Sequence, residues 1–424
     1  MSSPFTRRPV IAWALYDWAN SAFATTVMAG FFPVFFKQYW SAGSEATVST
    51  FRLGLANGIG SLVIALLAPL LGAAADRGGA RVKLLSLFTV LGVAMTGGLY
   101  WVEKGDWETA VLFYALASVG FAGGIIFADS LMLDVAEEQQ FDRVSAYAYS
   151  LGYLGGGLLF ALNVAMTLKP ALFGLPDAAT AVRLSFIMVA VWWAVFTIPL
   201  LLWVRERQSA APLPLLRALG AGFSELRGTL HQISRYRTIC LFLASYWLYI
   251  DGVNTVIKMA VDYGLSLGFE AASLITALLI TQFVAFPAAL GFGWVSERLG
   301  TRRALLLAIG VYLATTVWAY WLDDVGDFYA MAVVIGLVQG GIQSASRAFY
   351  GRLVPPDKAG EFFGFFNMMG KFAAVLGPIL TGWVAVSTGS SRLAILSLVL
   401  LFLFGGILLL RVPDPGPPRA STSH

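Results

Sequence analysis

Two aspartates stand inside long apolar stretches of this sequence, and each is followed three positions later by an asparagine. Asp17 and Asn20 lie in the first apolar stretch, and Asp251 and Asn254 lie in one just past the middle of the chain. A carboxylate in hydrocarbon is costly unless it faces protein or water, so such residues mark a pathway for ions or substrate. Residues three apart share a helix face. Each pair therefore predicts a site for a proton or an ammonium group, with structural pairing between helices as the alternative.

Other polar side chains in apolar stretches complement these acids. Asp129 and Arg347 lie near the inner ends of stretches in different halves of the chain, which predicts a salt bridge at an inner mouth. The alternative for this pair is that each side chain extends to the lipid headgroups. Lys371 lies too deep for that and is the best intramembrane cation, so it or Arg347 is expected to bind a carboxylate. Neutral hydrogen bonds are expected from Gln343, one turn before Arg347, and from Asn20 and Asn254.

The composition is that of an integral membrane protein. Of the 424 residues, 58% are hydrophobic and only 12% are charged, with a mean hydropathy of +0.75, whereas soluble domains carry about 25% charged residues. The apolar runs are long and lack the alternation of a membrane β-barrel, so we expect an all-α protein. The net charge of +4 is assigned to loops near lipid headgroups and not to nucleic-acid binding.

Enzyme chemistry has no signature in this chain. One cysteine and two histidines exclude a thiol metal cluster and make a histidine metal site unexpected. Phosphate-binding loops, nucleophile elbows and zinc-protease motifs are not found. We therefore expect no enzyme, no metal and no cofactor, and uphill transport would need an ion gradient.

A hydropathy window of about 19 residues predicts twelve membrane spans. They are 11–36, 51–73, 84–102, 109–132, 144–167, 184–204, 238–261, 272–295, 303–322, 328–350, 361–386 and 392–411. The longest polar interruption separates six spans from six. The predicted domains are an N-terminal six-helix bundle (1–204), a cytoplasmic linker (205–237), a C-terminal six-helix bundle (238–412) and a disordered cytoplasmic tail (413–424). Lysine and arginine concentrate in the loops on the side of the N-terminus, which places both termini in the cytoplasm.

A glycine- and arginine-rich turn occurs once in each half. Residues 72–81 read Gly-x3-Asp-Arg-x-Gly-x-Arg, and residues 293–302 repeat the pattern with Glu in place of Asp. An even number of spans separates the copies, so the halves form a parallel repeat with a site between them. The acid can accept bonds from a facing helix N-terminus, and the arginines can pair with loop acids, which predicts a cytoplasmic gate; the alternative is a role in topology alone. The candidate gate residues are Asp76, Arg77, Arg81, Glu297, Arg298 and Arg302, with Asp129 and Arg347 at the inner mouth.

The turn at residues 72–83 resembles the most specific motif of the major facilitator superfamily. Within this superfamily, one family is resembled more closely. The sequence Tyr-Asp-Trp-Ala-Asn-Ser-Ala-Phe at 16–23 is similar to the first helix of the autophagy-linked vacuolar amino-acid effluxers and their bacterial relatives. Residues 341–347, 360–366 and Gly377-Pro378 carry the same resemblance.

This resemblance implies a secondary transporter that moves a small polar solute by alternating access, with an amino acid, exported, as the best candidate. Proton coupling is a hypothesis that rests on the buried carboxylates. A drug or sugar transporter of the same fold and a non-transporting receptor or scaffold remain alternatives. The expected partners are the solute, membrane lipid and a coupling proton. We expect a monomer in a prokaryotic inner (plasma) membrane.

Overall fold

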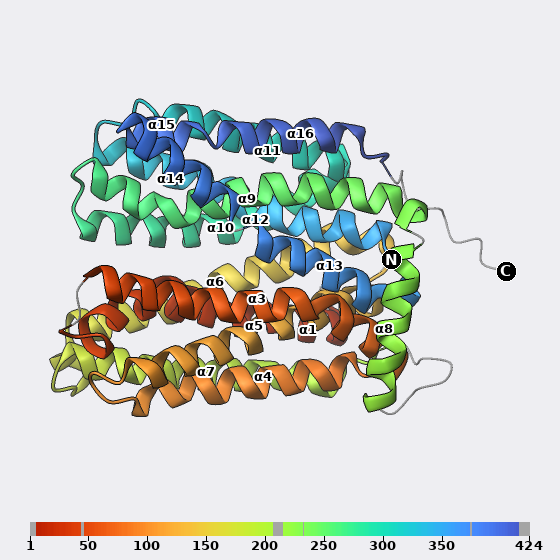
Figure 1. Ribbon diagram of the computed structural model, residues 1–424, viewed down its shortest axis with the longest axis horizontal. Coiled ribbons are helices and arrows are strands. Elements are labelled where there is room, and N and C mark those ends of the chain that lie inside the picture. The colour runs from red at the N-terminus through yellow and green to blue at the C-terminus, as the bar shows by residue number, and fades with distance from the viewer. Residues whose placement is uncertain (1–5, 44–45, 207–214, 232, 374, 415–424) are drawn as a thin grey trace.

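The computed structural model of the chain describes residues 6–43, 46–206, 215–231, 233–373 and 375–414. The long helices run along one common direction in two groups, one above the other in Figure 1. Part of the predicted linker, residues 207–214 and 232, and the predicted tail from residue 415 onward lie outside the described residues.

The first group of helices is formed by the N-terminal half of the chain. Its members are α1 (Arg8–Ala22), α2 (Phe32–Phe35), α3 (Ala46–Gly78), α4 (Arg81–Gly98), α5 (Trp107–Val135), α6 (Phe141–Leu168) and α7 (Ala178–Trp203). Two π-helical segments, Phe23–Phe31 and Phe36–Trp40, continue α1 and α2 into one long span, Arg8–Trp40.

The second group is formed by the C-terminal half. Its members are α9 (Arg237–Ser266), α10 (Ala271–Leu299), α11 (Thr301–Ala319), α12 (Val325–Leu353), α13 (Ala359–Phe372), α14 (Leu376–Thr388), α15 (Ser391–Leu396) and α16 (Val399–Arg411). Between the two groups, α8 (Leu215–His231) lies across the helix ends at one side of the molecule (Figure 1). This arrangement confirms an all-helical fold of two bundles.

The described residues contain eleven helical stretches that are long and apolar enough to cross a membrane. The 33-residue α3 runs alongside them and covers the expected span at 51–73 (Figure 1). A count of twelve spans therefore stays a prediction. Helices are the form that the apolar composition dictates, because each backbone N–H and C=O group in lipid must be bonded within its own segment.

Three helices that begin at the end opposite α8 start with a capping aspartate. Asp106, Asp177 and Asp324 each accept a bond from the backbone N–H three residues later, at 3.2, 2.7 and 2.9 Å. The cap satisfies an N–H group that the helix itself leaves free. The first turns of α5, α7 and α12 are thus fixed by their own sequence.

The two bundles approach most closely where α3 meets α13. A Cβ added to Gly364 would lie 2.5 Å from the carbonyl oxygen of Ala68, and one added to Gly72 would overlap the backbone of Gly360. Only glycine fits such a backbone contact. These glycines therefore bring the first half of α13 directly against α3.

The eleventh predicted span is interrupted in the middle. α13 ends at Phe372 and α14 begins at Leu376, so a helix C-terminus and a helix N-terminus both lie inside the expected stretch 361–386. Such ends carry free backbone groups that need partners. Discontinuous helices in transporters place these groups at binding sites.

Candidate functional site

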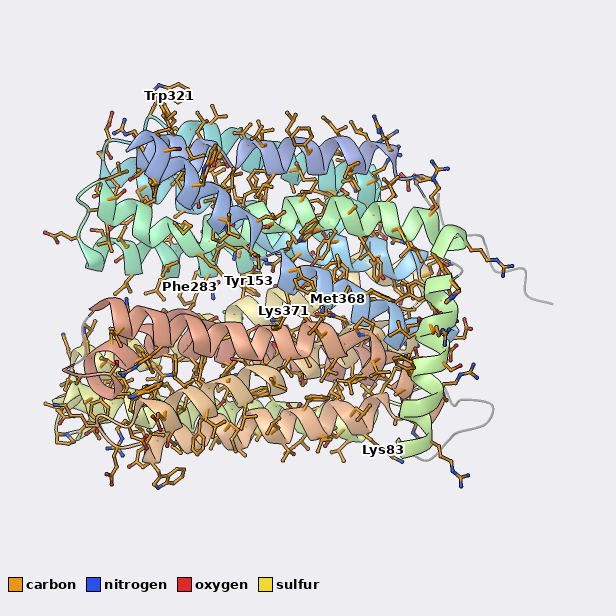
Figure 2. The ribbon with its side chains drawn as sticks, viewed as in Figure 1. Lys83, Tyr153, Phe283, Trp321, Met368 and Lys371 are labelled. Atoms are coloured by element: carbon orange, nitrogen blue, oxygen red, sulfur yellow. The ribbon has the colours of Figure 1, made fainter. Side chains whose placement is uncertain are left out.

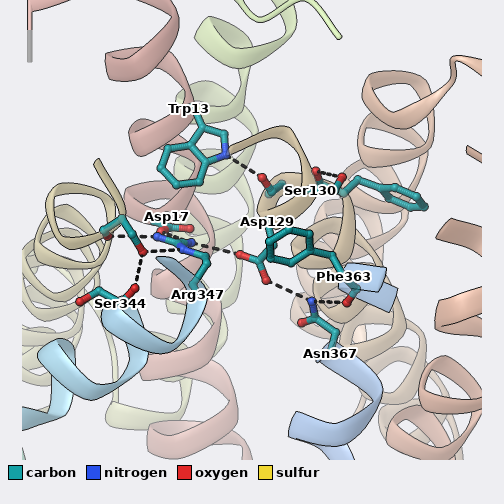
Figure 3. A network of polar contacts seen from close by, with 11 residues as sticks. Trp13, Asp17, Asp129, Ser130, Ser344, Arg347, Phe363 and Asn367 are labelled. Carbon is teal, nitrogen blue, oxygen red and sulfur yellow. Dashed lines mark hydrogen bonds and ion pairs between the residues drawn. The ribbon is translucent and has the colours of Figure 1, made fainter. Parts of the chain in front are cut away.

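Arg347 on α12 is the centre of a polar network that joins the two bundles (Figure 3). Its Nη1 lies 3.1 Å from Asp17 Oδ2 on α1 and 3.1 Å from Asp129 Oδ1 on α5. Its Nε donates to Ser145 Oγ at 2.9 Å, and its Nη2 donates to the carbonyl oxygen of Ser145 at 3.1 Å. One guanidinium group from the second bundle therefore binds three helices of the first.

Aromatic rings and a second amide complete the surroundings of Arg347. Its Cζ lies 4.7 Å from the ring centroid of Trp13 and 4.3 Å from that of Tyr149, which are distances for cation–π contact. Asn367 on α13 donates to Asp129 Oδ2 at 3.1 Å (Figure 3). Only 2% of Arg347 is exposed, so its donors are committed to protein groups.

The charges of this network do not balance. Arg347 carries one positive charge, while Asp17 and Asp129 carry two negative charges when both are ionised. An excess negative charge away from water is unfavourable unless a cation compensates it. The site is therefore suited to hold one proton or one ammonium group.

The network contains predicted and unpredicted members. The Asp129–Arg347 salt bridge is present as expected, and Asp17, expected as a ligand, contacts the same guanidinium. Ser145 and Asn367 were not among the predicted site residues. Asn367 precedes Lys371 by one helical turn, and that spacing is the sequence signal that points to it.

Asp76 connects α3 to α13 at the end of the molecule next to α8. Its two carboxylate oxygens accept bonds from the backbone N–H groups of Gly360 and Glu361, both at 2.9 Å. These N–H groups lie in the first turn of α13, where the helix dipole favours a negative charge. The expected bond between the gate acid and a facing helix N-terminus is present in this structure.

Arg81 holds the same corner together from within the first bundle. It lies 2.9 Å from Asp134 and 3.6 Å from Asp76, and its backbone N–H donates to Glu206 Oε2 at 2.7 Å. Burial raises the pKa of the Glu206 carboxyl above its ordinary value, while the neighbouring Arg81 groups oppose that shift. Arg81 thus binds acids of α3, α5 and the segment after α7.

Helix α8 adds a contact that the sequence did not predict. Its Glu225 pairs with Arg77 of the first bundle and lies 3.4 Å from Lys358 Nζ of the second. Lys358 also donates to Thr229 of α8 at 3.1 Å. The linker helix therefore joins both bundles at one end of the molecule.

The second copy of the gate motif uses only one of its three charged residues between bundles. Glu297 on α10 accepts from Arg143 Nε on α6 at 2.6 Å. Arg298 lies over the ring of Trp294 on its own helix, 3.6 Å from the centroid, and Arg302 donates to the carbonyl of Val412 at 2.9 Å. Among the described residues, neither of these two arginines forms an ion pair with the first bundle.

A further ion pair lies beside that copy. Arg352 at the end of α12 pairs with Asp142 at the start of α6, and its Nη1 donates to Thr301 Oγ1 at 2.6 Å. The ion pairs described above that link the two bundles lie in the half of the molecule next to α8. The expected cytoplasmic side is accordingly the closed side.

Asp251 lies at the break in the eleventh span. Its oxygens accept backbone N–H bonds from Leu376 at 2.9 Å and Gly377 at 3.0 Å, and Thr255 Oγ1 lies 3.3 Å away. Asp251 thus caps the N-terminus of α14 across the bundle, as Asp76 caps α13. Its predicted role in proton or substrate binding stays a prediction.

The remaining polar candidates are dispersed. Asn20 is 4% exposed and lies between Tyr16, which bonds Thr89, and Phe23, which stacks on Tyr114, so it faces the interior of the first bundle. Asn254 is half-buried on α9.

Two other candidates lie between the bundles. Gln343 Oε1 accepts a bond from Tyr153 of α6 at 3.0 Å. Lys371 and Tyr153 lie in the region where the two groups of helices meet (Figure 2).

Comparison with known proteins identifies the family of this chain. The model of the family described as vacuole effluxer Atg22 like matches residues 5–137 and 132–415. The chain belongs to this family. It is accordingly a multi-pass membrane transporter of the major facilitator fold.

Relatives of this Atg22-like transporter occur in bacteria and fungi. A protein of Bacillus subtilis, named as an uncharacterized transporter of the major facilitator type, YxiO, is 38% identical over 95% of this chain and 94% of its own length. Autophagy-related protein 22-1 of Emericella nidulans is 28% identical over 61% of this chain. The match spans 47% of that fungal protein's length.

Solved structures of low sequence identity share the fold. The human organic anion transporter MFSD10 superposes with a TM-score of 0.73 at 15% identity, over 95% of this chain and 99% of its own. The transporter FucP in its outward conformation gives 0.70 at 13% identity, over 96% and 100% of the two chains. At these identities the likeness shows the fold alone.

Proposed function

We propose that this transporter exports an amino acid from the cytoplasm by alternating access, coupled to the movement of protons. The observation that carries the proposal is the Arg347 network, because it combines a link between the bundles with one uncompensated negative charge.

The network couples charge to conformation. Arg347 holds the bundles together through Asp17 and Asp129, so a proton or an ammonium group that neutralises one carboxylate weakens that link. The bundles then part at the cytoplasmic end, where Asp76 and Glu225 complete the closure. Loss of the cation restores the ion pairs and closes that end again.

An amino acid suits the charges of the site. Its ammonium group matches the excess negative charge of Asp17 and Asp129, and the description of the family, vacuole effluxer, is that of proteins that release a solute from a compartment. Asn20 and Asn254 have no part in this proposal, and Gln343 supplies a neutral hydrogen bond beside Tyr153.

Flux measurements on purified protein in liposomes test the proposal. Radiolabelled amino acids are offered with and without an imposed pH gradient. We expect accumulation that follows the gradient and collapses with a protonophore. Exchange of a sugar or a drug in place of amino acids would overturn the substrate assignment, and the absence of any solute flux would favour the receptor or scaffold class.

The proposal also includes the membrane, the orientation and the oligomeric state of the protein. We place it as a monomer in a bacterial inner membrane, with the end that carries α8 and both termini in the cytoplasm. The excess of Lys and Arg in the loops on that side supports this orientation. Protease accessibility of the C-terminal tail in sealed membrane vesicles checks it.

A further inference from the structure

Lys371 is a cation at the interface between the bundles that has no acidic partner among the described residues. It lies in the last turn of α13, and its Nζ is 5.6 Å from the ring centroid of Phe121 on α5. An ammonium group away from water is unfavourable without a counter-charge.

The side chain borders a small cavity between α3, α5 and α13. The cavity encloses about 150 Å³ of space not filled by atoms. Its other lining residues are Ile64, Ala65, Ala68, Ala122, Ile126 and Asn367. Lys371 and Asn367 are the two residues with polar side chains at this otherwise apolar enclosure.

Arg347 is not free to bind a carboxylate in this state. Its Nε, Nη1 and Nη2 donate to Ser145, Asp17 and Asp129. A carboxylate that approached Arg347 would have to displace one of these acceptors. Of the two cations expected to bind a carboxylate, only Lys371 lacks an anionic partner in the described part of the chain.

Asn367 places Lys371 next to the negative end of the network. The two residues are four apart, so they share a face of α13 with their Cβ atoms about 5–6 Å apart. Both N–H bonds of Asn367 are used, on Asp129 and on the carbonyl of Phe363, which leaves its oxygen as an acceptor. Through Asn367, the cation on α13 therefore adjoins the carboxylate of Asp129 on α5.

The cavity lies between α3 and α13 at the place where these helices are in close contact. In this state it is too narrow to admit a ligand, and it lies behind the contact of Asp76 with the first turn of α13. Separation of α13 from α3 at the cytoplasmic end would break that contact and widen the space beside Lys371.

We infer that Lys371 is an anion subsite that binds the carboxylate of a small solute in the state open to the cytoplasm. The inference rests on the proposed function and adds to it the group that recognises the substrate's negative end. Lys258, which is exposed and does not border the cavity, is the matched control.

Binding in detergent tests this role without transport. The melting temperature is measured with acetate, propionate and alanine, and with ethylamine and ethanol as partners that lack the carboxylate. We expect the carboxylates and alanine to raise it in the parent protein and in Lys258→Gln, since a ligand stabilises the state that binds it. In Lys371→Gln the affinity for alanine should fall about tenfold or more, the factor that corresponds to about 1.4 kcal/mol.

Two outcomes separate the subsite from the proposed function. Carboxylate binding that needs Lys371, without any amino-acid flux, supports the subsite and overturns the amino-acid substrate. Proton-coupled amino-acid flux with an unchanged KM in Lys371→Gln overturns the subsite and leaves the proposed function standing. Lys371→Met checks folding: it removes an unpaired charge, so it should melt no lower than the parent protein, and it should also fail to bind alanine.

Discussion

The guanidinium Nη1 of Arg347 lies 3.1 Å from Asp17 Oδ2, although 330 positions separate the two residues. The first comes from α12 and the second from α1, so the bond connects helices of different bundles. The same nitrogen contacts Asp129. The bundles cannot separate around this point unless charge-assisted hydrogen bonds break, and that coupling sets the expectations below.

The network should tolerate the loss of a carboxylate better than the loss of the guanidinium. Arg347→Gln leaves two buried carboxylates facing each other, and removal of one partner of a buried pair costs about 3–5 kcal/mol. Asp129→Asn leaves one carboxylate for one guanidinium, but its single amide oxygen can accept from only one of Arg347 and Asn367, and the lost acceptor costs about 1–3 kcal/mol. We expect a marked fall in melting temperature for the first variant and a smaller fall for the second. Equal losses would contradict the charge count.

The Asp129→Asn variant also tests whether this carboxylate couples transport to protons. Asp129→Asn removes a group that can take up a proton, so we expect transport that no longer responds to an imposed pH gradient while solute exchange continues. Two rates are compared in the same liposomes: uptake driven by an imposed pH gradient, and exchange of labelled for unlabelled solute without a gradient. Retained gradient-driven accumulation would remove Asp129 from the proposed coupling.

Asp76 should control the cytoplasmic seal. Asp76→Ala removes both acceptors from the first turn of α13, and loss of an N-terminal cap costs about 0.5–2 kcal/mol. We expect faster labelling, from the cytoplasmic side, of a cysteine placed at Ser344, which is 1% exposed. Cys240 is the one native cysteine and is first replaced by Ala. Labelling at the parent rate would show that Asp76 does not hold the seal.

The close contact of α3 and α13 should depend on glycine. In Gly364→Ala the new Cβ would lie 2.5 Å from the carbonyl oxygen of Ala68, so the helices must move apart. Overpacking of this kind costs about 1–3 kcal/mol. Gly382→Ala is the control, because nothing lies within 4 Å of its added Cβ. A lower melting temperature for Gly364→Ala alone is expected, and equal values would mean that the backbone adjusts freely.

Asp251 has two candidate roles with opposite consequences. As a proton site, Asp251→Asn would abolish uphill transport driven by pH and spare exchange. If Asp251 instead caps α14, Asp251→Asn replaces one of its two acceptor oxygens with an NH2 group. One of the N–H groups of Leu376 and Gly377 then loses its acceptor. An unsatisfied donor costs about 1–3 kcal/mol. We expect a lower melting temperature and an unchanged pH response, and the reverse pattern would restore the proton role.

The ion pairs of α8 should favour the closed state without contributing much to the melting temperature. Glu225→Gln weakens its ion pairs with Arg77 and Lys358, and partly exposed pairs contribute about 0–1 kcal/mol. We therefore expect a small change in melting temperature but faster cytoplasmic labelling of the cysteine at position 344. Glu270→Gln, at the opposite end of the molecule, is the control and should leave labelling unchanged.

Sequence reasoning recovered features that depend on distance along a helix. Hydropathy placed the spans, and equal depth in two halves predicted the Asp129–Arg347 pair. The glycine- and arginine-rich turn predicted that Asp76 would bond a facing helix N-terminus. Each of these follows from the rise of a helix and from charge, which the sequence states directly.

Other features required the packing of one helix against another. Asn20 is three residues from Asp17 and close to it in depth, yet it faces the interior of its own bundle while Asp17 faces Arg347. Asp251 resembles Asp17 in pattern, yet it caps α14, whose start lies within a stretch that hydropathy treats as one span.

By itself, therefore, the sequence determined the membrane class, the duplication, the depth of each charge and the types of group available for binding. Only the tertiary structure decided which carboxylate meets Arg347, which one caps a helix and that Lys371 has no acid beside it in the described residues. Depth is a property of one helix, but the partner of a side chain depends on the rotation of two helices and on where a neighbour breaks.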